Sequence, residues 1–153
     1  MPHLQIDDVQ LAYDSAGQGS PVIFVHGYPF NRSLWTDQVD ALSNRYRVIT
    51  VDLRGFGESS RSDSPATMSR MAQDIATLMD KLEIFQATFA GLSMGGYVLL
   101  AFYKQFPNRV SALVLADTRA SADNDEGKKV RAQQAETILP EGMAGTADAM
   151  LQK

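Results

Sequence analysis

The sequence contains no cysteine and only two histidines, His3 and His26, among its 153 residues. Without cysteine the chain has no disulfide framework, no thiolate metal site and no thiol nucleophile. Histidine is the side chain that most often transfers protons in catalysis. A mechanism that needs a histidine base can therefore draw only on His3 or His26 within this sequence.

Long apolar runs and an excess of positive charge are also missing. No run approaches the roughly 18 residues of a membrane span, and the N-terminal stretch has neither the charged nor the apolar region of a signal peptide. The net charge of −4 argues against a nucleic-acid-binding surface, which would be basic. With 44% hydrophobic and 21% charged residues, the composition is typical of a globular domain. We therefore expect a cytoplasmic protein that binds neither nucleic acid nor membranes.

Two kinds of strand pattern follow one another along the chain. Apolar and polar residues alternate in residues 4–13, on both sides of Asp7 and Asp8, which predicts an N-terminal antiparallel hairpin. Four later runs are short, almost continuously apolar and rich in Val, Ile and Phe, as parallel strands buried on both faces are. These runs are residues 21–25, 47–51, 87–90 and 112–116.

Segments with helical periodicity separate these predicted strands. Apolar residues recur every three or four positions in residues 35–42, 68–82 and 94–102, and Pro107 is expected to end the last of these helices. Strands that alternate with helices predict an α/β fold, with a mostly parallel sheet and helices on both of its faces. Ligands bind such sheets at the carboxyl ends of the strands, so the residues that follow each strand are the candidates for a site.

The pattern Gly-x-Ser-x-Gly occurs at residues 91–95, between a predicted strand and a predicted helix. In that context the serine sits on a sharp turn that exposes its hydroxyl, so Ser93 is the candidate nucleophile. Gly91 and Gly95 leave room for the strand and the helix to approach each other. The alternative is that Ser93 only caps the N-terminus of the helix in a glycine-rich turn.

Three motifs in this order resemble those of the α/β-hydrolase fold family, in particular its smaller esterase, lactonase and perhydrolase-like members. They are VHGYPFN at 25–31, DLRGFGES at 52–59 and GLSMGG at 91–96. The resemblance covers essentially the whole chain. It implies acyl transfer through Ser93 on a small-molecule acyl substrate, by cleavage of an ester, lactone or thioester or by perhydrolysis. It implies neither a metal nor a cofactor.

The resemblance also gives roles to residues around Ser93. The backbone N–H groups of Tyr28 and Met94 would form the oxyanion hole, with Gly27 as a supporting residue. Donors fixed on a developing oxyanion contribute about 3–4 kcal/mol each to the stability of the transition state. His26 would brace the loop that carries Tyr28, and the alternative is that it acts as the catalytic base.

Residues 52–59 are predicted to form a structured loop beside the site, braced by an ion pair between Asp52 and Arg54. A phosphate-binding role for Gly55 and Gly57 is weaker, because the third glycine and the following helix of a dinucleotide motif are absent. We therefore interpret this loop as support for the site.

The histidine of a catalytic triad is missing from the part of the sequence where the family would have it. In this family the order along the chain is Ser, then Asp or Glu, then His, and no histidine follows Ser93. The resemblance implies that residues 1–117 are a partial α/β-hydrolase core, truncated after about the sixth strand. Residues 118–153 would then be the start of a lid.

Acidic residues after the sixth predicted strand have more than one interpretation. Asp117 is a possible acid of the triad, and the alternative is a strand-end aspartate that caps the following turn. Asp123 and Asp125 are predicted in the first turn of a lid helix, where carboxylates favour the helix dipole.

Two functions remain open on the sequence alone. The first is a serine hydrolase of carboxylic esters or related acyl compounds, present as an incomplete N-terminal fragment. The second is a non-catalytic remnant that binds a small molecule or a partner. In either case the strand at 112–116 would lie at a sheet edge, where unpaired N–H and C=O groups favour self-association.

Overall fold

The computed structural model describes residues 2–141 and residue 145 of the chain. The chain divides into two compact units, Met1–Ala120 and Ser121–Lys153. The first unit holds the sheet and every residue that the sequence nominates for a site. The assignment of the second unit to a lid stays a prediction.

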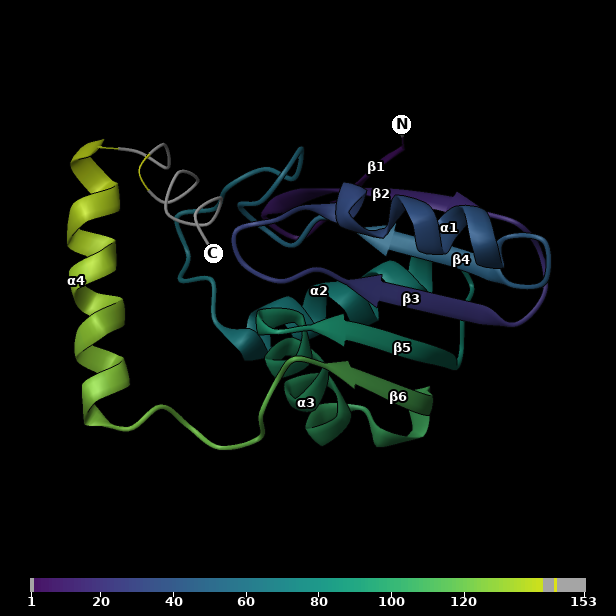
Figure 1. The fold of residues 1–153 in the computed structure, drawn as a ribbon. Helices are drawn as coiled ribbons and strands as arrows, with labels where there is room; N and C mark the ends of the chain where they lie inside the picture. Colours follow the sequence, from purple (N-terminus) through teal and green to yellow (C-terminus); the bar gives the residue numbers. More distant parts are fainter. Residues whose placement is uncertain (1, 142–144, 146–153) are drawn as a thin grey trace. The chain divides into compact units, whose positions relative to one another are not determined.

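A six-stranded sheet with the order β1-β2-β4-β3-β5-β6 forms the centre of the first unit (Figure 1). β1 and β2 make the predicted antiparallel hairpin, β2 pairs with β4 in antiparallel fashion, and the remaining pairs are parallel. The predicted fold class is therefore confirmed, with β5 and β6 slightly longer than their apolar runs. The strands are β1 (His3–Ile6), β2 (Val9–Ala16), β3 (Pro21–Val25), β4 (Arg47–Val51), β5 (Ala87–Leu92) and β6 (Val110–Ala116).

The helices of the first unit begin and end at residues with clear physical roles. The Thr67 side chain accepts a hydrogen bond from the backbone N–H of Arg70 at the start of α2, as an N-cap residue does. Helix α3 ends just before the Phe106–Pro107 pair, as the proline predicts. The helical segments are η1 (Arg32–Trp35), α1 (Thr36–Leu42), α2 (Met68–Lys81), α3 (Met94–Gln105) and η2 (Pro107–Arg109).

Successive residues of each parallel strand pack on opposite faces of the sheet. In β3, Ile23 and Val25 join the core beneath α2 and α3, whereas Phe24 packs with Trp35 and Val39 of η1 and α1 on the other face. Figure 1 shows α1 on one face of the sheet and α2 and α3 on the other. The apolar runs of β3, β4 and β5 fit strands covered on both faces. The same prediction was wrong for β6, which lies at the sheet edge and leaves Val114 and Leu115 exposed.

The second unit contains helix α4 (Asp125–Glu141). The Asn124 side chain accepts a hydrogen bond of 2.9 Å from the backbone N–H of Gly127. The first turn holds Asp125, as predicted, but Asp123 precedes the helix and instead forms an ion pair with Arg131. The prediction for Asp123 was wrong because Asn124 caps the helix. In the described part of the chain, no helix combines the length and apolarity needed to cross a membrane.

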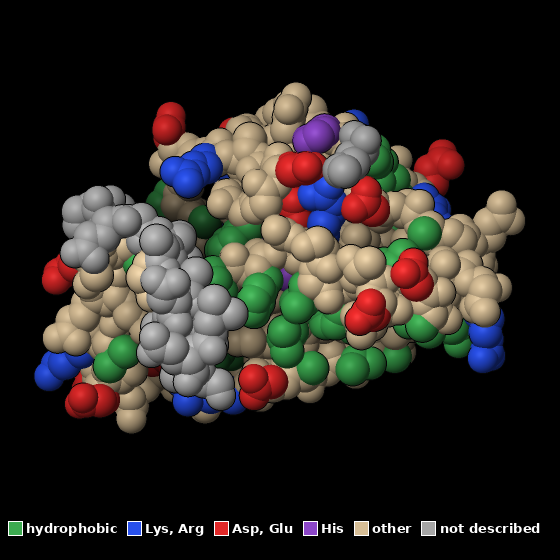
Figure 2. All heavy atoms as spheres, turned by 45° about the horizontal axis from the view of Figure 1, so that its top comes forward, with side chains coloured by type: hydrophobic (Ala, Val, Ile, Leu, Met, Phe, Trp, Pro, Cys, Tyr) green, Lys and Arg blue, Asp and Glu red, His purple; other side chains and the backbone are tan. Residues whose placement is uncertain are grey.

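Hydrophobic side chains also reach the surface. Figure 2 shows them, in green, gathered in the middle and lower part of the face drawn. Within the described residues β6 pairs only with β5, so it lies at an edge of the sheet. The large hydrophobic residues with the greatest exposure are Tyr28, Phe30, Phe85, Tyr103, Val114, Leu115 and Val130.

The aromatic core beneath the sheet gives a direct test of the packing. Phe102 of α3 is fully buried, with its ring centroid 4.8 Å from that of Phe89 and 5.2 Å from that of Phe106. We expect Phe102→Ala to lower the free energy of unfolding by about 3–5 kcal/mol in urea denaturation, because it leaves a cavity. Phe85→Ala is the control, since Phe85 is 77% exposed, and should change the value by less than about 0.5 kcal/mol.

Self-association through β6 stays a prediction that light scattering can test. Val114 is 54% exposed on this edge strand, and a lysine on an edge strand opposes pairing with a second strand. If copies pair through β6, Val114→Lys should lower the average mass in solution. Val130→Lys changes an exposed valine of α4 and should leave the mass unaltered. A monomeric wild-type chain would contradict the prediction.

Candidate active site

Ser93 forms a sharp turn between a strand and a helix. β5 ends at Leu92 and α3 begins at Met94, and the serine between them has φ 50° and ψ −112°. A positive φ is uncommon for a residue with a side chain and is maintained only where the surrounding structure enforces it. The Ser93 N–H donates to the carbonyl of Ala116 at 2.9 Å, which anchors the turn to the end of β6.

Two glycines of the motif leave no space for a side chain. A Cβ atom on Gly91 would lie 2.7 Å from Leu99 Cδ1 and 2.8 Å from the carbonyl carbon of Gly95. A Cβ atom on Gly95 would overlap the carbonyl oxygen of Val25, the last residue of β3. The small residues around Ser93 thus allow α3 to pack directly on the ends of β3 and β5.

The loop after β3 lies against the serine. A Cβ atom on Gly27 would lie 3.3 Å from Ser93 Cβ and 3.0 Å from the carbonyl oxygen of Leu92. Tyr28 follows Gly27, and its ring makes an edge-on contact with Phe56 at 6.2 Å between centroids. The pairing of β3 with β5 brings these segments together. The structure therefore groups Gly27 and Ser93, and the roles of the Tyr28 and Met94 amides as oxyanion donors stay predictions.

His26 is fully buried, and both of its ring nitrogens contact the backbone. Nδ1 lies 3.0 Å from the Gly27 carbonyl oxygen, and Nε2 accepts the N–H of Leu53 at 3.1 Å. Burial lowers the pKa of His26, although the hydrogen bond to Gly27 and the charge of Asp52 partly oppose this effect. A neutral ring with Nδ1 as donor and Nε2 as acceptor fits both contacts, and this arrangement favours a bracing role over a catalytic one.

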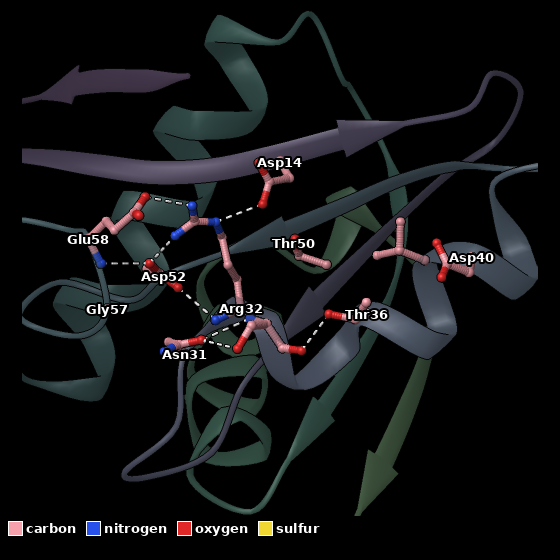
Figure 3. Close-up of a pocket in the computed structure, with 11 residues that line it drawn as sticks. Asp14, Asn31, Arg32, Thr36, Asp40, Thr50, Asp52, Gly57 and Glu58 are labelled. Carbon is pink, nitrogen blue, oxygen red and sulfur yellow. Dashed lines mark hydrogen bonds and ion pairs between the residues drawn. The ribbon is translucent and has the colours of Figure 1, made fainter. Parts of the chain in front are cut away.

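The buried carboxylate of Asp52 holds a network of polar contacts (Figure 3). It accepts the backbone N–H of Arg32 at 2.6 Å and that of Glu58 at 2.8 Å, and it forms an ion pair with the Arg32 guanidinium. The same guanidinium contacts Asp14 and Glu58, each at 2.7 Å. The predicted pair of Asp52 with Arg54 was wrong, because η1 places Arg32 beside Asp52.

The Arg32 guanidinium stays charged in this network. Burial alone would lower the pKa of Arg32, but its hydrogen bonds with Glu58 and Asp14 and the charge of Asp52 raise it above the ordinary value. The network ties η1 to the loop at 52–59, on the side of the sheet where the strands end. The motif at 52–59 thus has a structural role in shaping the surroundings of the loop after β3.

Arg54 has a different partner, which the sequence analysis missed. Its guanidinium forms two hydrogen bonds of 2.6 Å with the carboxylate of Asp74 in α2, and both residues are buried. These bonds raise the pKa of Arg54. A signal was present, since Asp74 lies on the apolar side of α2 between Met71 and Leu78, where a carboxylate needs a buried partner.

Two further residues considered from the sequence lie at the surface. His3 is exposed in β1, at the far side of the sheet order from β5. Asp117 is exposed after β6 and has φ 42°. The next residue, Thr118, is half-buried, and its hydroxyl donates to the Ser93 carbonyl oxygen at 2.9 Å. The side chain that reaches the serine from this turn is therefore that of Thr118.

A cavity of about 580 Å³ lies beside the Arg32 network (Figure 3). Its lining includes Asp14, Arg32, Asp40 and Glu58 but not Ser93, so we assign it no part in the candidate site. Among the residues that the structure describes, no group of three His, Asp or Glu side chains is arranged to hold a metal ion.

Comparisons with known proteins agree with this geometry. A family model described as alpha/beta hydrolase fold matches residues 20–147. The 3-oxoadipate enol-lactonase 2 of Acinetobacter baylyi is 35% identical over 132 residues, which are 85% of this chain and 49% of that relative. The chain belongs to the α/β-hydrolase fold family.

Solved structures show the same fold. A thermophilic esterase from Thermogutta terrifontis, with malate bound, has a TM-score of 0.95 and 39% sequence identity, and the match covers 99% of this chain and 58% of that one. The enol-lactonase from Burkholderia xenovorans has a TM-score of 0.87 and 33% identity, with 98% and 58% covered. The chain spans about half the length of the curated relatives it matches.

Lowering the pH should destabilise the protein through His26. Burial holds the pKa of His26 below its ordinary value of 6.5, so the unfolded chain binds more protons than the folded chain as the pH falls through that value. We expect the free energy of unfolding to fall more steeply between roughly pH 7.5 and pH 5.5 in wild type than in His26→Gln. Urea denaturation at several pH values across this range measures the free energy of unfolding and its slope against pH.

The exposed His3 supplies the matched control. His3→Gln should keep the wild-type slope of stability against pH. Equal slopes for wild type and both variants would show that protonation of His26 is not coupled to folding.

Proposed function

We propose that this chain is part of a serine hydrolase of carboxylic esters or related acyl compounds, with the acyl-enzyme formed on Ser93. The observation that carries the proposal is the backbone of Ser93, held at φ 50° between β5 and α3 with Gly27 against it. A serine on such a turn presents its hydroxyl to a substrate above the sheet. The names of the relatives, an esterase and enol-lactonases, support an ester or a lactone as the substrate.

The chemical steps follow from this arrangement. The Ser93 Oγ would attack the acyl carbonyl carbon while its proton passes to a base, and the backbone N–H groups of Tyr28 and Met94 would hold the oxyanion. Collapse of this intermediate releases the alcohol, which takes up the proton, and leaves the acyl group on Oγ. Water then attacks the acyl-enzyme by the same route and releases the carboxylic acid.

Among the described residues, neither histidine is placed to act as the general base for Ser93. Both ring nitrogens of His26 contact the backbone, and His3 is exposed in β1. We infer that the base and its acid come from sequence outside these 153 residues, so that the chain acts as a fragment of the enzyme. In a serine protease without its triad, the oxyanion hole and binding still give about 10³–10⁴ over the reaction in water.

The same arrangement favours a second function if the 153 residues act without a base from elsewhere. A serine with no base, beside N–H donors, can bind an acyl compound without turning it over. In that case the chain is a non-catalytic small-molecule or partner-binding module. Covalent labelling of Ser93 separates the two functions.

A fluorophosphonate probe tests Ser93 directly. We expect mass spectrometry of the labelled wild-type chain to locate the adduct on Ser93, and Ser93→Ala to abolish it. Ser69→Ala, which alters an exposed serine of α2, should label like wild type. Equal labelling of wild type and Ser93→Ala would remove Ser93 from the mechanism, and an unlabelled wild-type chain would support the binding module.

A further inference from the structure

The carbonyl group of Ser93 is held by two donors. Its oxygen accepts the backbone N–H of Gly96 at 2.9 Å and the hydroxyl of Thr118, also at 2.9 Å. A carbonyl oxygen has two lone pairs, and these two bonds occupy both. The first donor belongs to α3, whereas the second comes from the turn that follows β6.

This carbonyl is rigidly connected to the amide of Met94. The C=O of one residue and the N–H of the next lie in one planar, trans peptide unit and point in opposite directions. Donors that fix the oxygen of Ser93 therefore fix the direction of the Met94 N–H. A hydrogen bond to the carbonyl also polarises the unit and strengthens its N–H as a donor.

The Thr118 side chain is wedged against the start of α3. A Cβ atom on Gly96 would lie 2.5 Å from both Cγ2 and Oγ1 of Thr118, so the threonine occupies the space that the glycine leaves. Threonine is restricted at χ1 because its Cβ carries two heavy atoms. The hydroxyl is thereby held in the orientation that meets the Ser93 carbonyl.

We propose that Thr118 is a positioning residue of the oxyanion hole, which orients the Met94 N–H through the peptide unit that Met94 shares with Ser93. This inference rests on the proposed function, in which the Met94 amide receives the oxyanion. It links the turn after β6 to the chemistry at Ser93 without any contact between Thr118 and the substrate.

Two substitutions isolate the hydroxyl of Thr118, and two further variants serve as a control and as an independent disturbance of the same contact. Thr118→Val removes it at nearly constant shape, and Thr118→Ser retains it. Thr77→Val is the matched control, since the Thr77 hydroxyl also donates to a backbone carbonyl, that of Gln73 at 3.1 Å in α2. Gly96→Ala disturbs the same contact from the helix side, because its Cβ would displace the Thr118 side chain.

The first measurement is the rate of fluorophosphonate labelling at Ser93. In this reaction Oγ bonds to phosphorus, fluoride leaves, the serine proton passes to solvent and the phosphoryl oxygen takes the place of the oxyanion. We expect Thr118→Val and Gly96→Ala to lower the rate about fivefold, the effect of one hydrogen bond. Thr118→Ser and Thr77→Val should stay within about twofold of wild type, a difference smaller than the effect of one hydrogen bond.

The second measurement is the ¹⁵N chemical shift of the Met94 amide, which needs no reactivity. It should move in Thr118→Val and return in Thr118→Ser, with no change in Thr77→Val. A wild-type labelling rate in Thr118→Val, or an unmoved Met94 amide, would overturn the proposal. If no variant labels at Ser93, the proposed function fails, and the Met94 amide alone then decides the role of Thr118.

Discussion

The candidate site depends on one steric constraint, the direct contact of α3 with the ends of β3 and β5. A Cβ atom on Gly95 would overlap the carbonyl oxygen of Val25, and a Cβ atom on Gly27 would make tight contacts with Leu92 and Ser93. Such close approach brings the last residues of two neighbouring strands and the first residues of a helix to one point. The unusual backbone of Ser93 is the local consequence of this contact, and the surrounding hydrogen bonds maintain it.

Buried polar groups hold the loops around this point. Their net contribution to stability differs from the cost of removing one partner. Arg32 with Asp52 and Arg54 with Asp74 are buried ion pairs, whose net contribution to stability is small because desolvation opposes attraction. Removal of one partner is costly, since it leaves an uncompensated buried charge. These pairs connect η1 with the loop at 52–59 and that loop with α2. The neutral ring of His26 likewise connects the end of β3 with Leu53 by accepting the Leu53 N–H.

Under the proposed function, the first compact unit would hold the nucleophile without the base that takes its proton. The turn that presents Ser93 and the amides beside it are built within the first compact unit, which ends at Ala120. A histidine free to accept the serine proton is not among the groups that this unit places there, because His26 is committed to the backbone. In the proposed function, the contact of α3 with the sheet therefore positions the nucleophile, and a group elsewhere takes its proton.

The sequence by itself determined the local elements of this protein. Period-two alternation predicted the hairpin, the apolar runs predicted the parallel strands, and the Gly-x-Ser-x-Gly pattern predicted the turn at Ser93. These predictions succeeded because each depends on residues close together in the chain, where steric limits and hydrophobic periodicity act directly. The family resemblance was readable for the same reason, because each of its motifs occupies a short segment.

Only the tertiary structure decided the partners of the polar side chains. Asp52 and Arg54 are two residues apart, yet Asp52 pairs with Arg32 and Arg54 with Asp74. Likewise, the hydroxyl that reaches the Ser93 carbonyl comes from Thr118, after the next strand. An ion pair or a hydrogen bond acts over a few ångströms, so its partner depends on which loops the strand order brings together, and a linear sequence does not state that order.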